Sequence, residues 1–399
     1  MKNSEFKWFF FGCIYLAGLL LVPGSCQNSG TNQTQSEIDR IAAKWVPDSR
    51  VGICSIVIRT GQKGAAILSG ETTIAAAKDE IIKTLNDHYK NLIDSIIILP
   101  DTIKNKNFTG VATLSVINLR KEPDHSSELI SQALLGTPVL ILKKAGSWLM
   151  IQTPDNYLSW TEASSIKMMN QNEFEKWRDA SRVIYLDNTG WLHDTTSLNS
   201  GVVGDLTGGC VMEKTGELKG FVSVILPDRR RGFVEKQKVM DFKGWKENAQ
   251  CTEESICNTS LTFIGIPYLW GGTSAKGTDC SGFVQSVFFR NGLILQRDAS
   301  LQALHGMNID ISDGYDRLKK GDLLFFGSRV NSNPHVTHVA IYLGNKEYIN
   351  SSGRVMINSL DSTRADFVSY RLSSLLSAKR IIGVQNDPGI VPVAKHPWY

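Results

Sequence analysis

Residues 268–272 read Tyr-Leu-Trp-Gly-Gly, and residues 279–283 read Asp-Cys-Ser-Gly-Phe. Apolar residues follow at 283, 284, 287 and 288, and this spacing predicts a helix that begins near Cys280. Backbone N–H groups at a helix N-terminus lack intrahelical partners, and the helix dipole favours negative charge there. Both effects favour a thiolate, so Cys280 is a candidate nucleophile.

A nucleophilic cysteine needs a base, and residues 337–344, Thr-His-Val-Ala-Ile-Tyr-Leu-Gly, place His338 at the start of a predicted strand. A second strand-like run, residues 347–350, follows after a Gly-Asn-Lys hairpin signal. Antiparallel pairing would bring Asn350 close to His338. A cysteine, a histidine and a polar group that orients the imidazole are the usual parts of thiol acyl chemistry.

Three alternatives concern these residues. A free cysteine is most often a small buried apolar residue, which is the alternative for Cys280. His335 is the rival base, but it ends the run Asn-Ser-Asn-Pro-His, which predicts a loop, so we interpret it as a solvated or supporting residue. A metal site on His335 and His338 would need a helical setting and further Cys or His ligands nearby, and we expect no metal or cofactor.

Four motifs in this order resemble the NlpC/P60 family of papain-like cell-wall cysteine peptidases. They are the Tyr-x-Trp-Gly-Gly run, Asp-Cys-Ser-Gly-Phe, the Lys-Gly-Asp-Leu-Leu-Phe-Phe strand at 320–326 and the His-Val-Ala-Ile-Tyr-Leu-Gly strand. The resemblance covers residues 251–385. It implies that Cys280 is the nucleophile, His338 the base and Asn350 the third catalytic residue. It also implies an oxyanion held by the Cys280 N–H and the Tyr268 hydroxyl.

The whole chain has 399 residues, which predicts several domains. Its formal net charge of +4 is too small to indicate nucleic-acid binding. The one tight basic cluster, three arginines at 229–231, lies between Pro-Asp and a strand-like run and predicts a solvated turn. The sequence contains no phosphate-loop or dinucleotide-binding pattern.

The N-terminus has the pattern of an export signal. Lys2 and Lys7 precede an apolar run at 8–22, and Pro-Gly-Ser-Cys follows at 23–26. Residues 1–26 therefore resemble a bacterial lipoprotein signal with Cys26 as the lipidated residue, although Pro23 replaces the usual leucine. The polar run at 27–37 predicts a flexible tether. We expect an exported, periplasmic or cell-envelope protein attached to a membrane through Cys26; the alternative is a secreted protein that loses Cys26.

The five later cysteines are scattered and do not form a disulfide framework. Cys251 and Cys257 could pair only if the chain between them were not a regular helix. Residues 253–264 have a helical pattern, so we expect both thiols to be free.

The chain before the catalytic region divides into three predicted parts. Residues 27–107 combine the tether with a small α/β domain, with helices near 38–45 and 72–95 and strands at 54–58 and 96–100. Residues 108–167 contain short strands at 112–116, 138–142, 148–152 and 157–160, which predict a small barrel. Residues 168–250 are similarly strand-rich.

These two strand-rich parts resemble bacterial SH3-like domains, the first through Val-Ile-Asn-Leu-Arg-Lys-Glu-Pro at 116–123 and Gly-Ser-Trp at 146–148. The second lacks the Leu-Arg pair and would be a more divergent copy. The predicted fold class is therefore α+β: a papain-like catalytic domain at 251–385 preceded by two SH3-like barrels and a small α/β segment. Residues 386–399 are a predicted C-terminal tail.

Two such barrels before this catalytic domain resemble the γ-D-glutamyl-L-diamino acid endopeptidases, also called dipeptidyl-peptidase VI. In that subfamily the first barrel lies against the active site and helps to recognise the free amine of an N-terminal L-Ala. A desolvated ammonium needs charged acceptors and hydrogen bonds. The resemblance assigns substrate binding to Glu122, Tyr157, Asp279, Ser281, Arg297 and Ser300, with the two serines as candidates for a substrate carboxylate. The alternative makes Glu122 a surface residue and Tyr157 barrel core.

The expected function is hydrolysis of the bond between γ-D-Glu and a diamino acid, meso-diaminopimelate or Lys, in peptidoglycan stem peptides that begin with L-Ala. One alternative makes the barrels wall-binding modules, so that the protein acts on intact peptidoglycan or serves as a scaffold. Another keeps the Cys-His pair but changes the reaction to that of an amidase or an acyl transferase.

Overall fold

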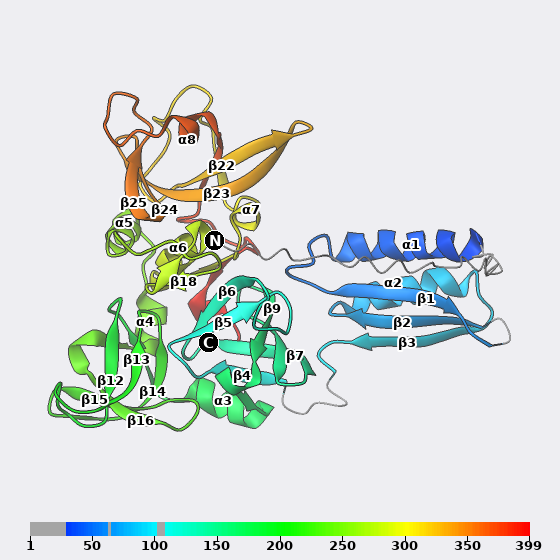
Figure 1. Cartoon of the computed structure of the whole chain (residues 1–399), viewed down its shortest axis with the longest axis horizontal. Coiled ribbons are helices and arrows are strands. Elements are labelled where there is room, and N and C mark those ends of the chain that lie inside the picture. The colour runs from blue at the N-terminus through cyan, green and yellow to red at the C-terminus, as the bar shows by residue number, and fades with distance from the viewer. Residues whose placement is uncertain (1–28, 63–64, 102–107) are drawn as a thin grey trace, which may run out of the picture.

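The computed structural model describes residues 29–62, 65–101 and 108–399 (Figure 1). The predicted signal and Cys26 lie outside the described residues. Within those ranges, no helix has the length and apolar character needed to cross a membrane. Cys54, Cys210, Cys251, Cys257 and Cys280 are all free thiols.

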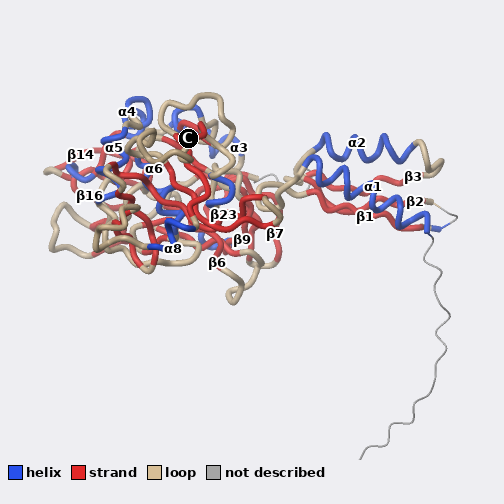
Figure 2. Tube along the Cα trace, turned by 90° about the horizontal axis from the view of Figure 1, so that it is seen from above, coloured by secondary structure: helices blue, strands red, loops and turns tan. Residues whose placement is uncertain are grey.

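The N-terminal unit projects from the rest of the molecule as an arm (Figures 1 and 2). Its three strands form a sheet in the order β1-β2-β3, in which β1 and β2 are antiparallel and β2 and β3 are parallel. Both helices bury apolar residues on one face of this sheet. The elements are α1 (Ser29–Trp45), β1 (Cys54–Thr60), β2 (Ala66–Thr72), α2 (Ala75–Asn86) and β3 (Leu92–Ile98).

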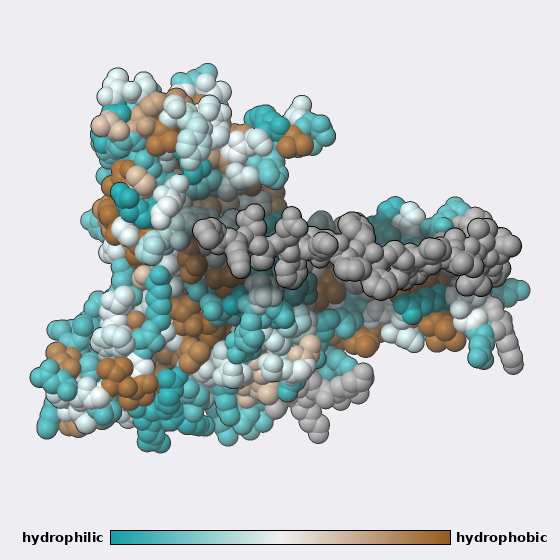
Figure 3. Space-filling view, in the orientation of Figure 1, coloured by the Kyte–Doolittle hydropathy of each residue, from teal (hydrophilic) through white to brown (hydrophobic). Residues whose placement is uncertain are grey.

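Two predictions for this unit were wrong, and one strand was missed. Residues 29–37 form the start of α1 rather than a flexible tether, because Ile38 and Ile41 bury in the core and stabilise the helix that precedes them. The helix predicted at 72–95 ends at Asn86, since residues 92–98 pair with β2. Strand β2 itself was not predicted. Apolar side chains of β3 remain exposed at Ile93, Ile97 and Ile98, and Figure 3 shows apolar patches along this edge of the arm.

Two seven-stranded units follow, the first barrel and the second barrel, and they share one topology. The strand order is β10-β4-β7-β8-β9-β5-β6 in the first and, read from its other end, β17-β11-β14-β15-β16-β12-β13 in the second. Each strand of the second therefore occupies the place of the strand seven earlier in the first. A short 3-10 helix precedes the last strand in both, at Ala163–Ser165 and Lys236–Lys238. The second barrel is thus a copy of the first in fold.

The strands of the first barrel are β4 (Thr109–Ala112), β5 (Val116–Arg120), β6 (Leu129–Leu134), β7 (Pro138–Ala145), β8 (Trp148–Gln152), β9 (Leu158–Glu162) and β10 (Ile166–Met169). Those of the second are β11 (Arg182–Tyr185), β12 (Gly190–His193), β13 (Val202–Leu206), β14 (Val211–Leu218), β15 (Phe221–Ile225), β16 (Arg231–Glu235) and β17 (Val239–Asp241). Helix α3 (Gln171–Asp179) joins the barrels, and α4 (Phe242–Asn248) follows the second. The single strand predicted at 112–116 is broken, because Thr113 bonds to the Ser165 carbonyl and the chain turns into β5 there.

The C-terminal region is built on a six-stranded antiparallel sheet in the order β21-β26-β22-β23-β24-β25. Helix α6 (Cys280–Arg290) packs on this sheet, and the apolar stripe predicted from the sequence is buried against Val339, Ile341 and Ile349. The sheet strands are β21 (Met307–Ile309), β22 (Leu323–Val330), β23 (Asn333–Gly344), β24 (Glu347–Ser352), β25 (Arg354–Ser359) and β26 (Leu375–Arg380). The smaller elements are α5 (Glu253–Leu261), β18 (Thr273–Ser274), β19 (Gly277–Thr278), β20 (Leu293–Leu295), α7 (Ala299–Gln302) and α8 (Ser369–Ser373).

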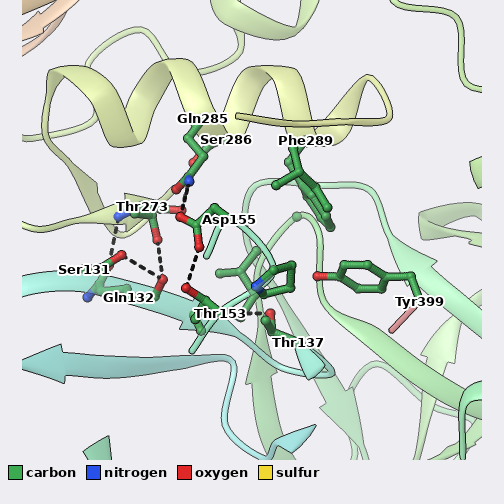
Figure 4. Close-up of a pocket in the computed structure, with 15 residues that line it drawn as sticks. Ser131, Gln132, Thr137, Thr153, Asp155, Thr273, Gln285, Ser286, Phe289 and Tyr399 are labelled. Carbon is green, nitrogen blue, oxygen red and sulfur yellow. Dashed lines mark hydrogen bonds between the residues drawn. The ribbon is translucent and has the colours of Figure 1, made fainter. Parts of the chain in front are cut away.

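The last residues pack between the units instead of forming a free tail. Strand β27 (Ile390–Pro392) pairs with β20, and Val393 and Tyr399 are buried because this segment is apolar. Tyr399 reaches a small cavity of about 80 Å³ between the first barrel and α6 (Figure 4). In the same interface Gln285 Nε2 donates to Asp155 Oδ2 at 2.7 Å, and burial raises the pKa of Asp155.

Candidate active site

Cys280 is the first residue of α6, and the preceding Asp279 caps the helix. Asp279 Oδ1 accepts from the Gly282 N–H at 2.7 Å. A Cβ on Gly282 would lie 2.0 Å from the Gly272 carbonyl oxygen, so this glycine allows the Gly-Gly loop to pass over the helix start. The two motifs that predict the site are therefore one packing unit that fixes the cysteine.

His338 and Asn350 lie on the neighbouring strands β23 and β24 and form a hydrogen bond. The His338 Nε2–H donates to Asn350 Oδ1 at 2.9 Å. The orientation of this amide is fixed because Asn350 Nδ2 donates to Asn358 Oδ1 at 2.9 Å and to the Met356 carbonyl at 3.3 Å. Nδ1 of His338 is then the nitrogen with a free lone pair, as a general base requires.

Burial sets the charge state of this pair. It raises the pKa of the Cys280 thiol to about 11, and the negative charge of Asp279 adds to the rise. It lowers the pKa of His338 to about 3, and the charge of Arg371 adds to that fall. The helix start and a Val339 N–H bond favour the thiolate, but the cost of burying a charge is larger. These shifts favour a neutral thiol at Cys280 and a neutral imidazole at His338, whereas the helix position alone favours a thiolate.

Cys280 opens into a cleft of about 570 Å³ that is walled by three parts of the chain. The first barrel contributes Lys121, Glu128, Ile130 and Tyr157, and the loop between α1 and β1 contributes Ser49 and Arg50. The catalytic region supplies the rest, including Tyr268, Trp270, Ser281, Asp298, Ser300 and Thr337. Burial raises the pKa of Tyr268 to about 12, so its hydroxyl keeps its proton and can donate a hydrogen bond in the cleft.

One end of the cleft carries a cluster around Asp298. The Tyr157 hydroxyl donates to Asp298 Oδ2 at 3.0 Å, and Arg50 Nη1 donates to the same oxygen at 2.7 Å. Asp298 stands at the N-cap of α7 but makes no capping bond there, because its carboxylate turns toward Tyr157 and Arg50. Burial raises the pKa of Tyr157, which keeps this phenol neutral.

Some of the predicted substrate-binding residues line the cleft, and others do not. Tyr157, Ser281 and Ser300 line the cleft with Cys280 and Tyr268. Asp279 also reaches it, but its two oxygens already accept from the Gly271 and Gly282 N–H groups and from Arg297. Arg297 is only 1% exposed and lies behind the cleft wall, where it also bonds Ser131 of the first barrel.

Glu122 is exposed and is not among the residues that line the cleft. It lies in the loop between β5 and β6, which a Ser127 hydroxyl closes by accepting from the Glu122 N–H at 2.9 Å. Glu128 in the same loop lines the cleft instead and accepts from Trp270 Nε1 at 2.9 Å. The acid of this loop that lines the cleft is therefore Glu128 and not Glu122, the acid named from the sequence.

Other functional candidates were missed or misplaced by the sequence prediction. Asp298 had a signal, since it lies between Arg297 and Ser300, two of the predicted substrate-binding residues. Arg50 had none, because it comes from a different unit. His335 belongs to strand β23 rather than a loop; its register partner is Ser328, and it is exposed at the cleft rim.

The comparisons with known proteins agree with this division of the site. The NlpC/P60 family pattern matches residues 265–372, and that of the bacterial dipeptidyl-peptidase Sh3 domain matches 119–166. Dipeptidyl-peptidase 6 of Lysinibacillus sphaericus is 29% identical over 265 residues, which are 63% of this chain and 92% of that protein. A gamma-D-glutamyl-L-lysine dipeptidyl-peptidase of Bacillus cereus is 27% identical over 233 residues, 57% of this chain and 68% of that protein.

The same fold is found in a crystal structure of an NlpC/P60 family protein from Bacillus cereus. It matches with a TM-score of 0.59 at 22% sequence identity, over 69% of this chain and 99% of that one. The family match spans the segment that holds Cys280 and His338, and the Sh3 match spans the segment that holds Tyr157. The chain belongs to the NlpC/P60 family of cysteine peptidases.

Proposed function

We propose that this peptidase hydrolyses the bond between γ-D-Glu and a diamino acid in wall-derived peptides that begin with a free L-Ala. The observation that carries the proposal is the Tyr157–Asp298 pair, which the first barrel and α7 present in the cleft that holds Cys280. A carboxylate and a phenol are suitable acceptors for an ammonium removed from water. Relatives named dipeptidyl-peptidase 6 and gamma-D-glutamyl-L-lysine dipeptidyl-peptidase support this substrate class.

In the proposed first step the Cys280 thiol gives its proton to His338 Nδ1 as the sulfur attacks the γ-carbonyl carbon. The oxyanion accepts from the Cys280 N–H at the start of α6 and from the Tyr268 hydroxyl. The imidazolium that forms is held by Asn350 Oδ1, which accepts from Nε2–H. Asn350 carries no charge, so it stabilises the imidazolium less than a carboxylate would.

His338 then donates that proton to the leaving amine of the diamino acid, and the C–N bond breaks to leave a thioester on Cys280. In the second half of the reaction, water loses a proton to His338 and attacks the thioester carbonyl. The C–S bond breaks, the thiolate takes the proton back, and the dipeptide L-Ala-D-Glu leaves. No step needs a metal or an organic cofactor.

In this proposal the substrate's ammonium contacts Asp298 and Tyr157, and Ser281 and Ser300 face its free α-carboxylate. Ser281 Oγ accepts from Arg297 Nη1 at 3.1 Å and donates to Asp279 Oδ1 at 3.3 Å, so in this proposal its hydroxyl turns from Asp279 to donate to the carboxylate. Glu128, rather than Glu122, is the barrel acid at the cleft wall. Asp279, which the family resemblance assigned to substrate binding, acts in this proposal by capping α6 and by pairing with Arg297.

The test compares L-Ala-γ-D-Glu-diamino acid tripeptides with free and acetylated amines, with products followed by mass. Acetylation removes a desolvated charge partner, so kcat/KM should fall at least ~100-fold. The matched variants Tyr157→Phe and Asp298→Asn should reduce this discrimination, while Cys280→Ala should abolish cleavage of both peptides. Equal rates on the free and acetylated peptides would refute the amine site. Tight binding to sacculi without tripeptide cleavage would favour wall-binding barrels instead.

We also propose that the protein is exported and attached to a membrane through a lipid on Cys26, on the basis of the sequence at 1–26. Cys26→Ser should abolish incorporation of a labelled fatty acid and release the protein into the soluble fraction. An unchanged membrane-bound fraction in that variant would reject the anchor.

A further inference from the structure

The loop between α1 and β1, residues 46–53, reaches the cleft from a unit outside both family matches. Its position is set by the first barrel. The Leu158 N–H of β9 donates to the Arg50 carbonyl at 2.8 Å, and Ile53 packs with Leu99, Leu142 and Leu158. Arg50 is therefore held beside Tyr157, the residue that precedes Leu158.

The Arg50 guanidinium joins two carboxylates. It donates to Asp48 through Nε at 2.9 Å and Nη2 at 2.5 Å, and to Asp298 through Nη1 at 2.7 Å. Nη1 also donates to the Ser300 hydroxyl at 3.1 Å. The planar guanidinium suits this arrangement, because its donors point in fixed directions that a lysine ammonium cannot reproduce.

The charges of this cluster leave one negative charge at the cleft. Asp48 and Asp298 contribute two negative charges and Arg50 one positive charge, so the sum is −1. Without Asp48, the positive charge of Arg50 would cancel the negative charge of Asp298. Two donors, Arg50 and Tyr157, hold Asp298 Oδ2; for Oδ1, the structure gives no hydrogen bond to any described residue.

We propose that this loop completes the substrate site and that Arg50 is a positioning residue for Asp298. Arg50 fixes Oδ2 so that Oδ1 accepts the substrate's ammonium, and Asp48 neutralises Arg50 so that Asp298 keeps its attraction for that ammonium. This inference rests on the proposed function. It makes the N-terminal unit a determinant of specificity for free-amine peptides.

The test measures kcat and KM of the full chain on the free tripeptide, and the ratio of kcat/KM for free and acetylated peptides. Arg50→Ala should raise KM about 10- to 100-fold, the range for one hydrogen bond to a charged group, and should lower the ratio. The value of kcat should change little, because Cys280 and His338 are untouched. The double variant D48A/R50A keeps the cluster at −1 and should show the same loss, which separates orientation from charge.

Two further variants complete the series. Arg50→Lys should give a ratio of kcat/KM for free and acetylated peptides between those of Arg50→Ala and the wild type, since a lysine ammonium cannot bridge both carboxylates. Arg59→Ala, at an exposed position of β1 in the same unit, should behave as the wild type. If Arg50→Ala lowers expression, D48N and R50K still test the same contacts.

A fall in KM for Arg50→Ala would mean that Arg50 occupies the ammonium's place, and would overturn the inference. The inference would also be overturned if the wild type discriminates between free and acetylated peptides and both Arg50→Ala and D48A/R50A keep the same ratio of kcat/KM values. Failure of the wild type to discriminate would instead reject the proposed amine site itself.

Discussion

At the scale of single residues, the site depends on a histidine that is buried without charge. His338 is 6% exposed, with its Nε2–H given to Asn350. The pairing of His338 with Asn350 could be predicted, since a short hairpin sets their register. Asn358, which fixes the Asn350 amide, could not, because its role depends on the register of a third strand. The low pKa of the His338 imidazole could not be predicted either, because it results from burial in the folded chain.

The buried imidazole predicts a pH dependence of stability. The pKa of His338 is about 3 when folded and near 6.5 when unfolded, so between these values the unfolded state binds more protons. Stability contributed by the neutral residue is therefore complete above pH ~6.5 and is lost as the pH falls toward ~3. The free energy of unfolding of the wild type should fall more steeply than that of His338→Gln in this window, as measured by urea denaturation. Parallel curves would contradict a buried neutral His338.

At the scale of secondary-structure elements, the glycines of the two motifs allow close packing. Gly271 has φ 77°, and a Cβ there would lie 2.5 Å from the Leu129 carbonyl oxygen of the first barrel. The sequence predicted the helix and the hairpin here, since each follows from local periodicity and turn residues. It did not predict that the first motif is the docking surface for β6. That contact joins residues far apart in the chain.

Gly282→Ala should therefore disrupt the start of α6. Its Cβ would meet the Gly272 carbonyl, a backbone atom that cannot move aside, so we expect a loss of about 1–3 kcal/mol in the free energy of unfolding, with reduced kcat. Gly216→Ala is the matched control, because a Cβ there meets nothing within 4 Å. Calorimetry and peptide hydrolysis test both. A stable, fully active Gly282→Ala enzyme would reject the close packing of loop and helix.

At the scale of the whole molecule, a buried ion pair links the nucleophile's helix to the first barrel. Arg297 donates to Asp279 at 2.6 Å and to Ser131 of β6 at 2.9 Å. The family resemblance offered Arg297 as a substrate-binding residue. Only the assembled units show that it lies behind the wall. Arg50 could not be predicted for the same reason, because the sequence does not show where the N-terminal unit lies relative to the cleft.

Removing Arg297 should cost more than removing an exposed partner. Arg297→Ala leaves Asp279 buried without its counter-charge, so the free energy of unfolding should fall by about 3–5 kcal/mol. Arg317→Ala breaks the exposed pair with Asp310 and should cost about 1 kcal/mol or less. Chemical denaturation of both variants gives the comparison. Similar small losses would show that Arg297 does not stabilise the assembly.

The place of Asp298 and Cys280 in one walled cleft has a consequence for where the substrate is cut. Asp298 precedes α7 and Cys280 begins α6, so the separation of amine acceptor and nucleophile is set by packed elements. Under the proposed function, the scissile bond is then chosen by counting from the amino end of the peptide. A peptide longer by a single residue at its amino end would present the wrong bond to Cys280.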